Sequence, residues 1–243
     1  MRVNFPLEVR AVLIDLDGTM LDTIHDLAEA ANGMRLALGM EALPAERIKT
    51  FVGKGIANLV KRTLTGSHNI DPDPALFDRA LPEYERQYMA VLTRDVLHFP
   101  GVEDGIRLMH DAGFLLACVT NKAERFTLPL LAASGLRPYF DLVVSGDTTV
   151  RKKPDPEPLL YAAAKFGVKP DEMVLIGDSV NDFEAARAAG CHVFIVPYGY
   201  NEGRDATALP ADAIVAGLVE AANLLKNTDT KRGIRRPQQR STH

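Results

Sequence analysis

The sequence of 243 residues has no tryptophan, two cysteines, six histidines and a net charge of only −4. Two cysteines cannot form a disulfide framework, and no Cys/His spacing typical of zinc sites occurs. No apolar run approaches the roughly 18 residues of a membrane-spanning helix, and no signal-peptide pattern precedes Asp15. The small net charge gives no reason to expect nucleic acid or a membrane as a partner. We therefore expect a soluble, cytoplasmic protein.

Hydrophobic residues make up 47% of the chain, which is enough for a sizeable core. Short, nearly continuous apolar runs alternate with segments of helical periodicity that end at a glycine. Such runs are typical of strands that are covered on both faces in a parallel sheet. The sequence therefore predicts an α/β fold with a doubly wound parallel sheet. The runs are AVLIDL (11–16), FLLACVT (114–120), DLVVSG (141–146), MVLIGD (173–178), HVFIVP (192–197) and a weaker one, DAIVAG (212–217).

One interval interrupts this alternation. Between Asp22 and about Leu97 the sequence offers only amphipathic helical patterns, at 27–39, 45–64 and 74–92. This interval is far longer than an ordinary connection of roughly 2–6 residues, so we expect a separate helical cap over the carboxyl ends of the strands, where open α/β sheets bind ligands. The predicted division is an α/β core of residues 1–22 and 97–226, a helical cap of residues 23–96, and a basic, disordered tail of residues 227–243.

The first apolar run ends in two carboxylates, in the stretch RAVLIDLDGTMLDT (10–23). Side chains two apart in a strand share one face, so Asp15 and Asp17 are expected to be neighbours. At about 5 Å and an effective dielectric constant of about 20, their repulsion is on the order of 3 kcal/mol. A positive partner must offset this repulsion. Gly18 permits the tight turn that directs Asp17 inward.

Other strand ends bring polar side chains to the same edge of the predicted sheet. The second strand is followed by Thr120 and Asn121, the loop after the third by Lys153, and the fourth by Asp178, Ser179 and Asp182. Carboxylate oxygens without cysteine or histidine are the ligand set of Mg2+, and the cation would offset the repulsion of the paired aspartates. Thr120 and Lys153, with backbone N–H groups, would hold an anion. The pattern indicates a Mg2+-dependent phosphate site.

Within such a site the two aspartates have different tasks. Asp15, the last residue of its strand, is placed to attack phosphorus and form an aspartyl-phosphate. Asp17, one step outward, would protonate the leaving oxygen and then deprotonate the hydrolytic water. Lys153 would neutralise charge on the transferring group, because electrostatic positioning dominates phosphoryl transfer.

The motifs DLDGT, VTN, KPDPEP and GDSVND, in this order, resemble the four motifs of the haloacid dehalogenase superfamily of aspartate-nucleophile phosphatases. The resemblance extends from about residue 10 to residue 225. It implies Asp15 as nucleophile, Asp17 as acid/base, and Thr120 and Lys153 as phosphate contacts. It further implies a cap of the helical-bundle type. The Mg2+ ligands that it implies are Asp15 and Asp178 by their side chains and Asp17 by its backbone carbonyl, with Asp182 supporting the metal shell.

Finer stretches resemble bacterial members of this superfamily that hydrolyse 2-phosphoglycolate to glycolate and phosphate. They are FVGKGI (51–56), KPDPEPLL, GDSVNDFEAARAAG and YGYNEG (198–203). Phosphatases of the same superfamily that act on phosphoserine, sugar phosphates or pyrophosphate share much of these sequences, and a phosphosugar mutase with the same four motifs is a further alternative. In the cap, Lys54 is a candidate contact for the substrate carboxylate, and the backbone amides at Gly53 and Gly55 would serve equally. The expected partner is a small phosphorylated metabolite, and the expected state is a monomer or homodimer.

Most of these candidates also have a purely structural interpretation. Thr120 and Asn121 would cap the following helix, Lys153 would lie on a surface loop, and Lys54 would be a solvated lysine at a helix end. Ser179 and Asp182 fit a capping box, a role that Asp182 can combine with support of the metal.

Two other functions compete with the phosphatase. A serine hydrolase based on Ser179 would need a nearby histidine base, and only His192 and His243 follow it in the sequence. A phospho-receiver module gathers carboxylates, Mg2+, threonine and lysine on a parallel sheet, but the predicted cap and the position of Asp17 favour the phosphatase.

Overall fold

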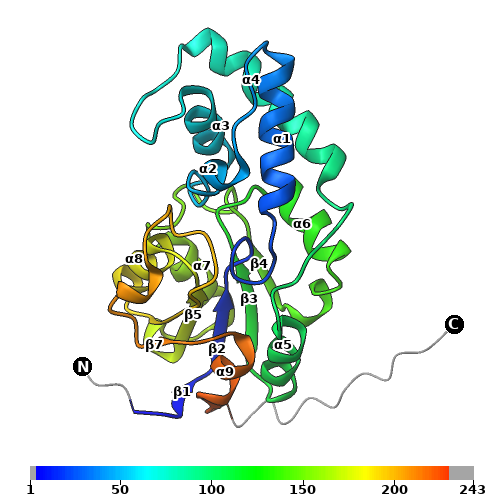
Figure 1. The fold of residues 1–243 in the computed structure, drawn as a ribbon. Coiled ribbons are helices and arrows are strands. Elements are labelled where there is room, and N and C mark those ends of the chain that lie inside the picture. The colour runs from blue at the N-terminus through cyan, green and yellow to red at the C-terminus, as the bar shows by residue number, and fades with distance from the viewer. Residues whose placement is uncertain (1–3, 230–243) are drawn as a thin grey trace, which may run out of the picture.

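The computed structural model describes residues 4–229 and is built around a six-stranded parallel sheet (Figure 1). The strand order is β4-β3-β2-β5-β6-β7, and every neighbouring pair is parallel. The first of these strands along the chain, β2, lies between β3 and β5, so the direction of winding reverses there. The strands are β2 (Ala11–Ile14), β3 (Leu115–Val119), β4 (Leu142–Val144), β5 (Met173–Gly177), β6 (His192–Ile195) and β7 (Ala213–Ile214).

Helices cover both faces of this sheet, which confirms the predicted doubly wound fold. Alternate residues of β2 enter different apolar clusters: Val12 and Ile14 pack on one face, and Ala11 and Leu13 on the other. The first face is covered by α5 (Val102–Asp111), α6 (Glu124–Ala133) and α9 (Leu218–Asn223), and the second by α7 (Glu157–Phe166) and α8 (Val180–Ala189). Within residues 4–229, 3-10 helices lie in three connections, at Arg137–Tyr139, Pro170–Glu172 and Ala206–Ala208.

The chain between residues 23 and 96 contains helices and loops but no strand. The helices are α1 (Ile24–Ala37), α2 (Ala45–Lys49), α3 (Ile56–Thr65) and α4 (Pro74–Val91). They gather beyond the carboxyl ends of the sheet strands (Figure 1). Their buried side chains include Met34, Ile48, Val60 and Tyr84. The segments entering and leaving this bundle lie side by side, because Leu21 bridges His98 and the Asp22 N–H donates to the Leu97 carbonyl at 2.9 Å.

A second, two-stranded parallel sheet joins β1 (Leu7–Val9) to β8 (Leu225–Asn227). No pattern in the sequence predicts this sheet, and the predicted disordered tail starts at residue 227. That boundary is wrong, because Asn227 pairs with Val9 and the Thr228 N–H donates to the Val9 carbonyl at 3.1 Å. The rest of the predicted tail, residues 230–243, lies outside the described residues. Within the described chain, no helix is both long and apolar enough to span a membrane.

Candidate active site

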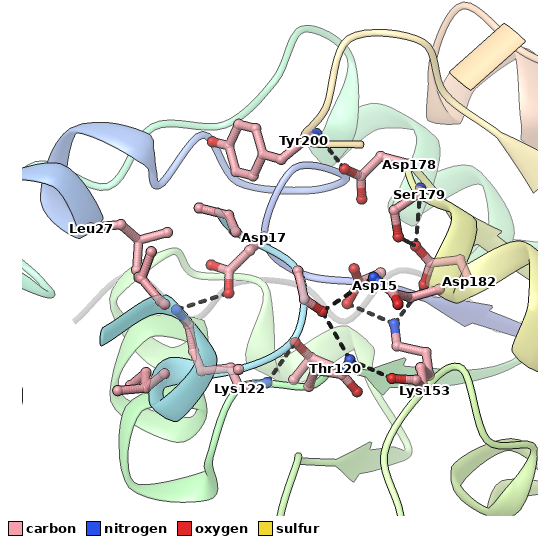
Figure 2. Close-up of a pocket in the computed structure, with 17 residues that line it drawn as sticks. Asp15, Asp17, Leu27, Thr120, Lys122, Lys153, Asp178, Ser179, Asp182 and Tyr200 are labelled. Atoms are coloured by element: carbon pink, nitrogen blue, oxygen red, sulfur yellow. Dashed lines mark hydrogen bonds and ion pairs between the residues drawn. The ribbon is translucent and has the colours of Figure 1, made fainter. Parts of the chain in front are cut away.

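A pocket opens where the carboxyl ends of β2, β3 and β5 face the helical bundle (Figure 2). Its volume is about 50 Å3, and since one water needs roughly 10–15 Å3, the enclosed part suits a small ligand. The residues from the α/β part are Asp15, Asp17, Thr120, Asn121, Lys122, Lys153, Asp178, Ser179, Asn181, Asp182 and Tyr200. Those from the bundle are Leu27, Val52, Gly53, Gly55, Ile56 and Leu59.

Lys153 forms the buried centre of the site. Its Nζ lies 2.9 Å from Asp15 Oδ1 and 2.6 Å from Asp182 Oδ1 (Figure 2). It also donates to the Val119 carbonyl at 2.7 Å. The residue is only 3% exposed, so the alternative of a lysine on a surface loop is wrong. These three partners match the three N–H groups of an ammonium. Lys153 therefore holds the ends of β2, β3 and α8 together.

Asp15, Asp178 and Asp182 form a compact group of carboxylates, with oxygens within 4.8 Å of one another. Burial raises the pKa of Asp15 to about 7; Lys153 opposes this shift and Asp182 adds to it. Burial, with Asp182 and Asp15 nearby, holds the pKa of Asp178 well above its usual range. Asp15 Oδ1 has its ion pair with Lys153 but accepts no hydrogen bond. A group that is this short of positive charge fits a divalent cation.

The turn after β2 is built around this carboxylate group. The Asp15 N–H donates to the Ile176 carbonyl at 3.0 Å, which continues the strand pairing past Ile14. Gly18 has φ 88°, and a Cβ there would lie 2.5 Å from Asp178 Oδ2. Both facts require glycine, as the sequence predicted for the turn. Asp178 itself accepts from the Thr19 hydroxyl at 2.9 Å and from the Tyr200 N–H at 2.5 Å.

Asp182 combines two of the interpretations offered for it. Its Oδ2 accepts from the Ser179 hydroxyl at 2.6 Å and from the Ser179 N–H at 3.2 Å, which completes a capping box at the start of α8. Its Oδ1 faces Lys153. Because both oxygens have partners, Asp182 is placed to support the carboxylate group. The Ser179 hydroxyl is directed at a carboxylate, and no histidine is among the described residues that line the pocket, so the serine hydrolase has no base.

Asp17 has a partner that the sequence analysis missed. Its Oδ2 lies 2.9 Å from Lys122 Nζ (Figure 2). Its Oδ1 accepts from the Thr23 hydroxyl at 2.8 Å. Lys122 also donates to the Tyr88 hydroxyl of α4 at 2.6 Å. Each aspartate of the opening motif thus has its own ammonium, Lys153 for Asp15 and Lys122 for Asp17. A metal ion is therefore not the only source of the charge that offsets their repulsion.

Thr120 and Asn121 do not cap a helix. Helix α6 begins at Glu124, and Ala123 is the residue at its cap position. Residues 120–122, between β3 and this helix, line the pocket instead. The Thr120 hydroxyl accepts a hydrogen bond from the backbone N–H of Lys122 at 3.3 Å, and Thr120 lines the cavity. Asn121 donates to the Lys153 carbonyl at 2.8 Å and to the Gly53 carbonyl at 3.0 Å. Asn121 therefore ties the helical bundle to the carboxylate group.

The bundle meets the pocket through backbone at Gly53 and Gly55, where φ is 122° and 79°. Lys54, between them, does not line the pocket. Its side chain is 42% exposed and its Nζ lies 3.9 Å from Glu202 Oε1. The prediction of Lys54 as a side-chain contact for the substrate is therefore at odds with the structure, because the turn brings the two glycines to the pocket and Lys54 toward Glu202.

Known proteins with similar sequences and structures belong to one family of hydrolases. A model of the haloacid dehalogenase-like hydrolase family matches residues 12–196. The chain is 56% identical over 226 residues to a phosphoglycolate phosphatase of Nitrosospira multiformis, covering 93% of this chain and 100% of the relative. It is 52% identical over 219 residues to one of Thiobacillus denitrificans, covering 90% and 96%. The crystal structure of a predicted phosphoglycolate phosphatase from Haemophilus somnus has a TM-score of 0.83 at 27% identity, covering 88% and 96%.

Proposed function

Because the chain belongs to the haloacid dehalogenase-like hydrolase family, we propose that it is a Mg2+-dependent phosphatase that hydrolyses 2-phosphoglycolate to glycolate and phosphate. The observation that carries the proposal is the buried cluster of Asp15, Lys153, Asp178 and Asp182 beside Asp17 in one small pocket. The names of the relatives support the choice of substrate.

In the proposed reaction a carboxylate oxygen of Asp15 attacks phosphorus, and the bond from phosphorus to the ester oxygen breaks. Asp17 gives its proton to the leaving oxygen, so that glycolate departs. Asp17 then takes a proton from the water that attacks the aspartyl-phosphate, and this second displacement releases phosphate and restores Asp15. Lys153 favours the ionised form of Asp15 that the attack requires. Thr120 contacts the phosphate from the end of β3.

The residues that would hold Mg2+ are Asp15 and Asp178 by their carboxylates and Asp17 by its backbone carbonyl. The side chain of Asp17 remains available as acid/base beside Lys122. When bound, the cation supplies positive charge that keeps the carboxylates ionised and neutralises charge on the phosphoryl group. Asp182 supports this arrangement through Lys153 and Ser179.

We assign the helices α1–α4, within residues 23–96, the role of a cap that excludes bulk water from the core formed by residues 1–22 and 97–226. The paired connections at Leu21 and His98 support this division. Leu27, Val52 and Ile56 give the cap side of the pocket an apolar lining, which suits a small substrate. A cytoplasmic location is supported by the two cysteines, which are buried as free thiols.

The test is the release of inorganic phosphate from 2-phosphoglycolate, a hexose phosphate, pyrophosphate and an aryl phosphate, each with Mg2+ and with a chelator. We expect 2-phosphoglycolate to have the highest kcat/KM, and the chelator to abolish turnover. Equal or higher kcat/KM for a hexose phosphate would contradict the assigned substrate. Conversion of a hexose phosphate to its isomer without release of phosphate would indicate a mutase.

A further inference from the structure

The two sides of the pocket differ in charge. From the bundle come four aliphatic side chains, Leu27, Val52, Ile56 and Leu59, and the backbone of two glycines. None of these side chains can pair with an anion. A substrate that carries a carboxylate as well as a phosphate needs a partner for each, because an unpaired buried charge is strongly unfavourable. The backbone amides at Gly53 and Gly55 are neutral donors, so a charged partner for the carboxylate must be sought among the core residues.

Among the described residues that line the pocket, the two ammonium groups are those of Lys153 and Lys122. Lys153 already has Val119, Asp15 and Asp182 around its nitrogen, and it lies at the proposed nucleophile. The Asn121 amide likewise donates to two carbonyls, those of Gly53 and Lys153. The Lys153 ammonium is thus enclosed by partners beside the proposed nucleophile, and both amide donors of Asn121 are in use, so neither group is placed to hold a second anion.

Lys122 has such a donor. It is 4% exposed, and its ammonium has two described polar partners, Asp17 Oδ2 at 2.9 Å and the Tyr88 hydroxyl at 2.6 Å. An ammonium has three N–H groups, so one remains. Figure 2 shows the Lys122 side chain extending along the pocket toward Asp17.

The chemistry of the leaving group places the substrate carboxylate near this nitrogen. Asp17 is proposed to protonate the ester oxygen, and in 2-phosphoglycolate a single CH2 group separates that oxygen from the carboxylate carbon. A cation 2.9 Å from Asp17 is therefore close to the carboxylate when the ester oxygen is at Asp17.

We propose that Lys122 is the specificity-determining residue that binds the carboxylate of the substrate, with the Tyr88 hydroxyl of α4 holding the ammonium in place. This assignment rests on the proposed function. It replaces Lys54, whose ammonium faces Glu202. The helical bundle then contributes to substrate recognition through the Tyr88 hydroxyl, although it places no charged side chain in the pocket.

The test compares 2-phosphoglycolate with 2-hydroxyethyl phosphate, in which a neutral CH2OH replaces the carboxylate, using the full chain with Mg2+. Because Lys122 also pairs with Asp17, Lys122→Gln is expected to lower kcat/KM for both substrates. The loss for 2-phosphoglycolate should exceed the loss for the neutral analogue at least tenfold, about 1.4 kcal/mol, and the excess should lie mainly in KM. Equal losses for the two substrates would overturn the proposal and leave Lys122 acting on Asp17 alone.

Lys54→Gln serves as the matched control, and Tyr88→Phe is the alternative variant if Lys122→Gln does not fold. Lys54→Gln makes the same chemical change outside the pocket, and the ratio of the two kcat/KM values should stay at the wild-type value. If Lys122→Gln does not fold, Tyr88→Phe keeps the buried ring and removes only the hydroxyl. We expect that ratio to fall about threefold in Tyr88→Phe, and an unchanged ratio would overturn the proposal. Failure of the proposed function is distinguishable, because it appears in the wild type as no turnover of 2-phosphoglycolate.

Discussion

The core side and the cap side of the pocket are built in different ways. On the core side, ion pairs of 2.9 Å or less join Lys153 to Asp15 and Asp182, and Lys122 to Asp17. On the cap side the lining is aliphatic carbon and glycine backbone. The difference indicates that the sheet positions charges for chemistry, whereas the helices limit the size of the substrate. Substitutions on the core side should therefore change the rate or, at Lys122, the preference for a substrate with a carboxylate, whereas substitutions on the cap side should change the size of substrate that is accepted.

The largest effect should come from the nucleophile on the core side. Asp15→Asn keeps the shape of the side chain but removes the attacking carboxylate, so we expect kcat to fall by roughly 10⁴-fold or more. In chelator the melting temperature should not fall, because the substitution removes a buried carboxylate whose pKa burial already raises to about 7. Steady-state kinetics with a thermal melt checks both. Substantial turnover in the folded variant would remove Asp15 from its role.

The same core carboxylate should make stability depend on pH when metal is chelated. The pKa of Asp15 is about 7 in the folded protein against an ordinary 3.8, so the folded state binds the extra proton between these values. The free energy of unfolding should then fall as pH rises from about 4 to 7, by on the order of 3 kcal/mol, and level off above.

Urea unfolding at several pH values, in chelator and in Mg2+, checks this dependence. We expect Mg2+ to raise stability most above pH 7, where the carboxylates are ionised. In chelator, Asp15→Asn should make the profile less steep, and Asp178, whose pKa burial also raises, accounts for the slope that remains. A profile in chelator that is equally steep in the wild type and in Asp15→Asn would assign the dependence to other groups.

A third prediction concerns the contact that holds the cap against the core. Arg62 of α3 lies 2.8 Å from Glu202 Oε1, both side chains are buried, and Arg62 also donates to the Phe51 carbonyl at 3.0 Å. Arg62→Met leaves Glu202 as a buried charge without this partner, so we expect a loss of about 3 kcal/mol in the free energy of unfolding.

The double variant Arg62→Met/Glu202→Gln is the control for this pair, because it removes both charges. Chemical denaturation should show it to be more stable than Arg62→Met alone. If the two variants are equally stable, the loss in Arg62→Met comes from packing or from the bond to Phe51, and the ion pair contributes little.

The smallest effect should come from the apolar lining. Leu59→Ala enlarges the cap side, and we expect kcat/KM for a hexose phosphate to rise a few fold relative to 2-phosphoglycolate while kcat for 2-phosphoglycolate changes little. A large loss of kcat for 2-phosphoglycolate in this variant would mean that the cap side does more than limit size.

The same contrast explains what could be predicted from the sequence. Apolar runs and helical periods are local, so the sheet and its flanking helices followed from them. Asp15, Asp178 and Lys153 follow strand ends, and parallel strands bring their carboxyl ends to one edge. Their proximity was therefore predictable.

The remaining features depend on contacts that no local pattern encodes. Lys122 is buried because Asp17 and Tyr88 surround its ammonium, and Tyr88 is 34 residues away in the chain. Only its place directly after Asn121 could have drawn attention to it. Lys54 was misplaced because a sequence does not tell which side of the turn between two glycines a side chain takes. The pairing of β1 with β8 joins opposite ends of the described chain, and three-residue strands give too short a pattern.

The most direct test of the account is to find the covalent intermediate. The wild-type enzyme is mixed with radiolabelled 2-[³²P]phosphoglycolate and Mg2+, quenched in acid within one turnover, and digested. We predict that the label is recovered on the peptide that contains Asp15, and that Asp15→Asn carries none. Full hydrolysis in the same time with no label on the protein, or label on another residue, would contradict Asp15 as the nucleophile.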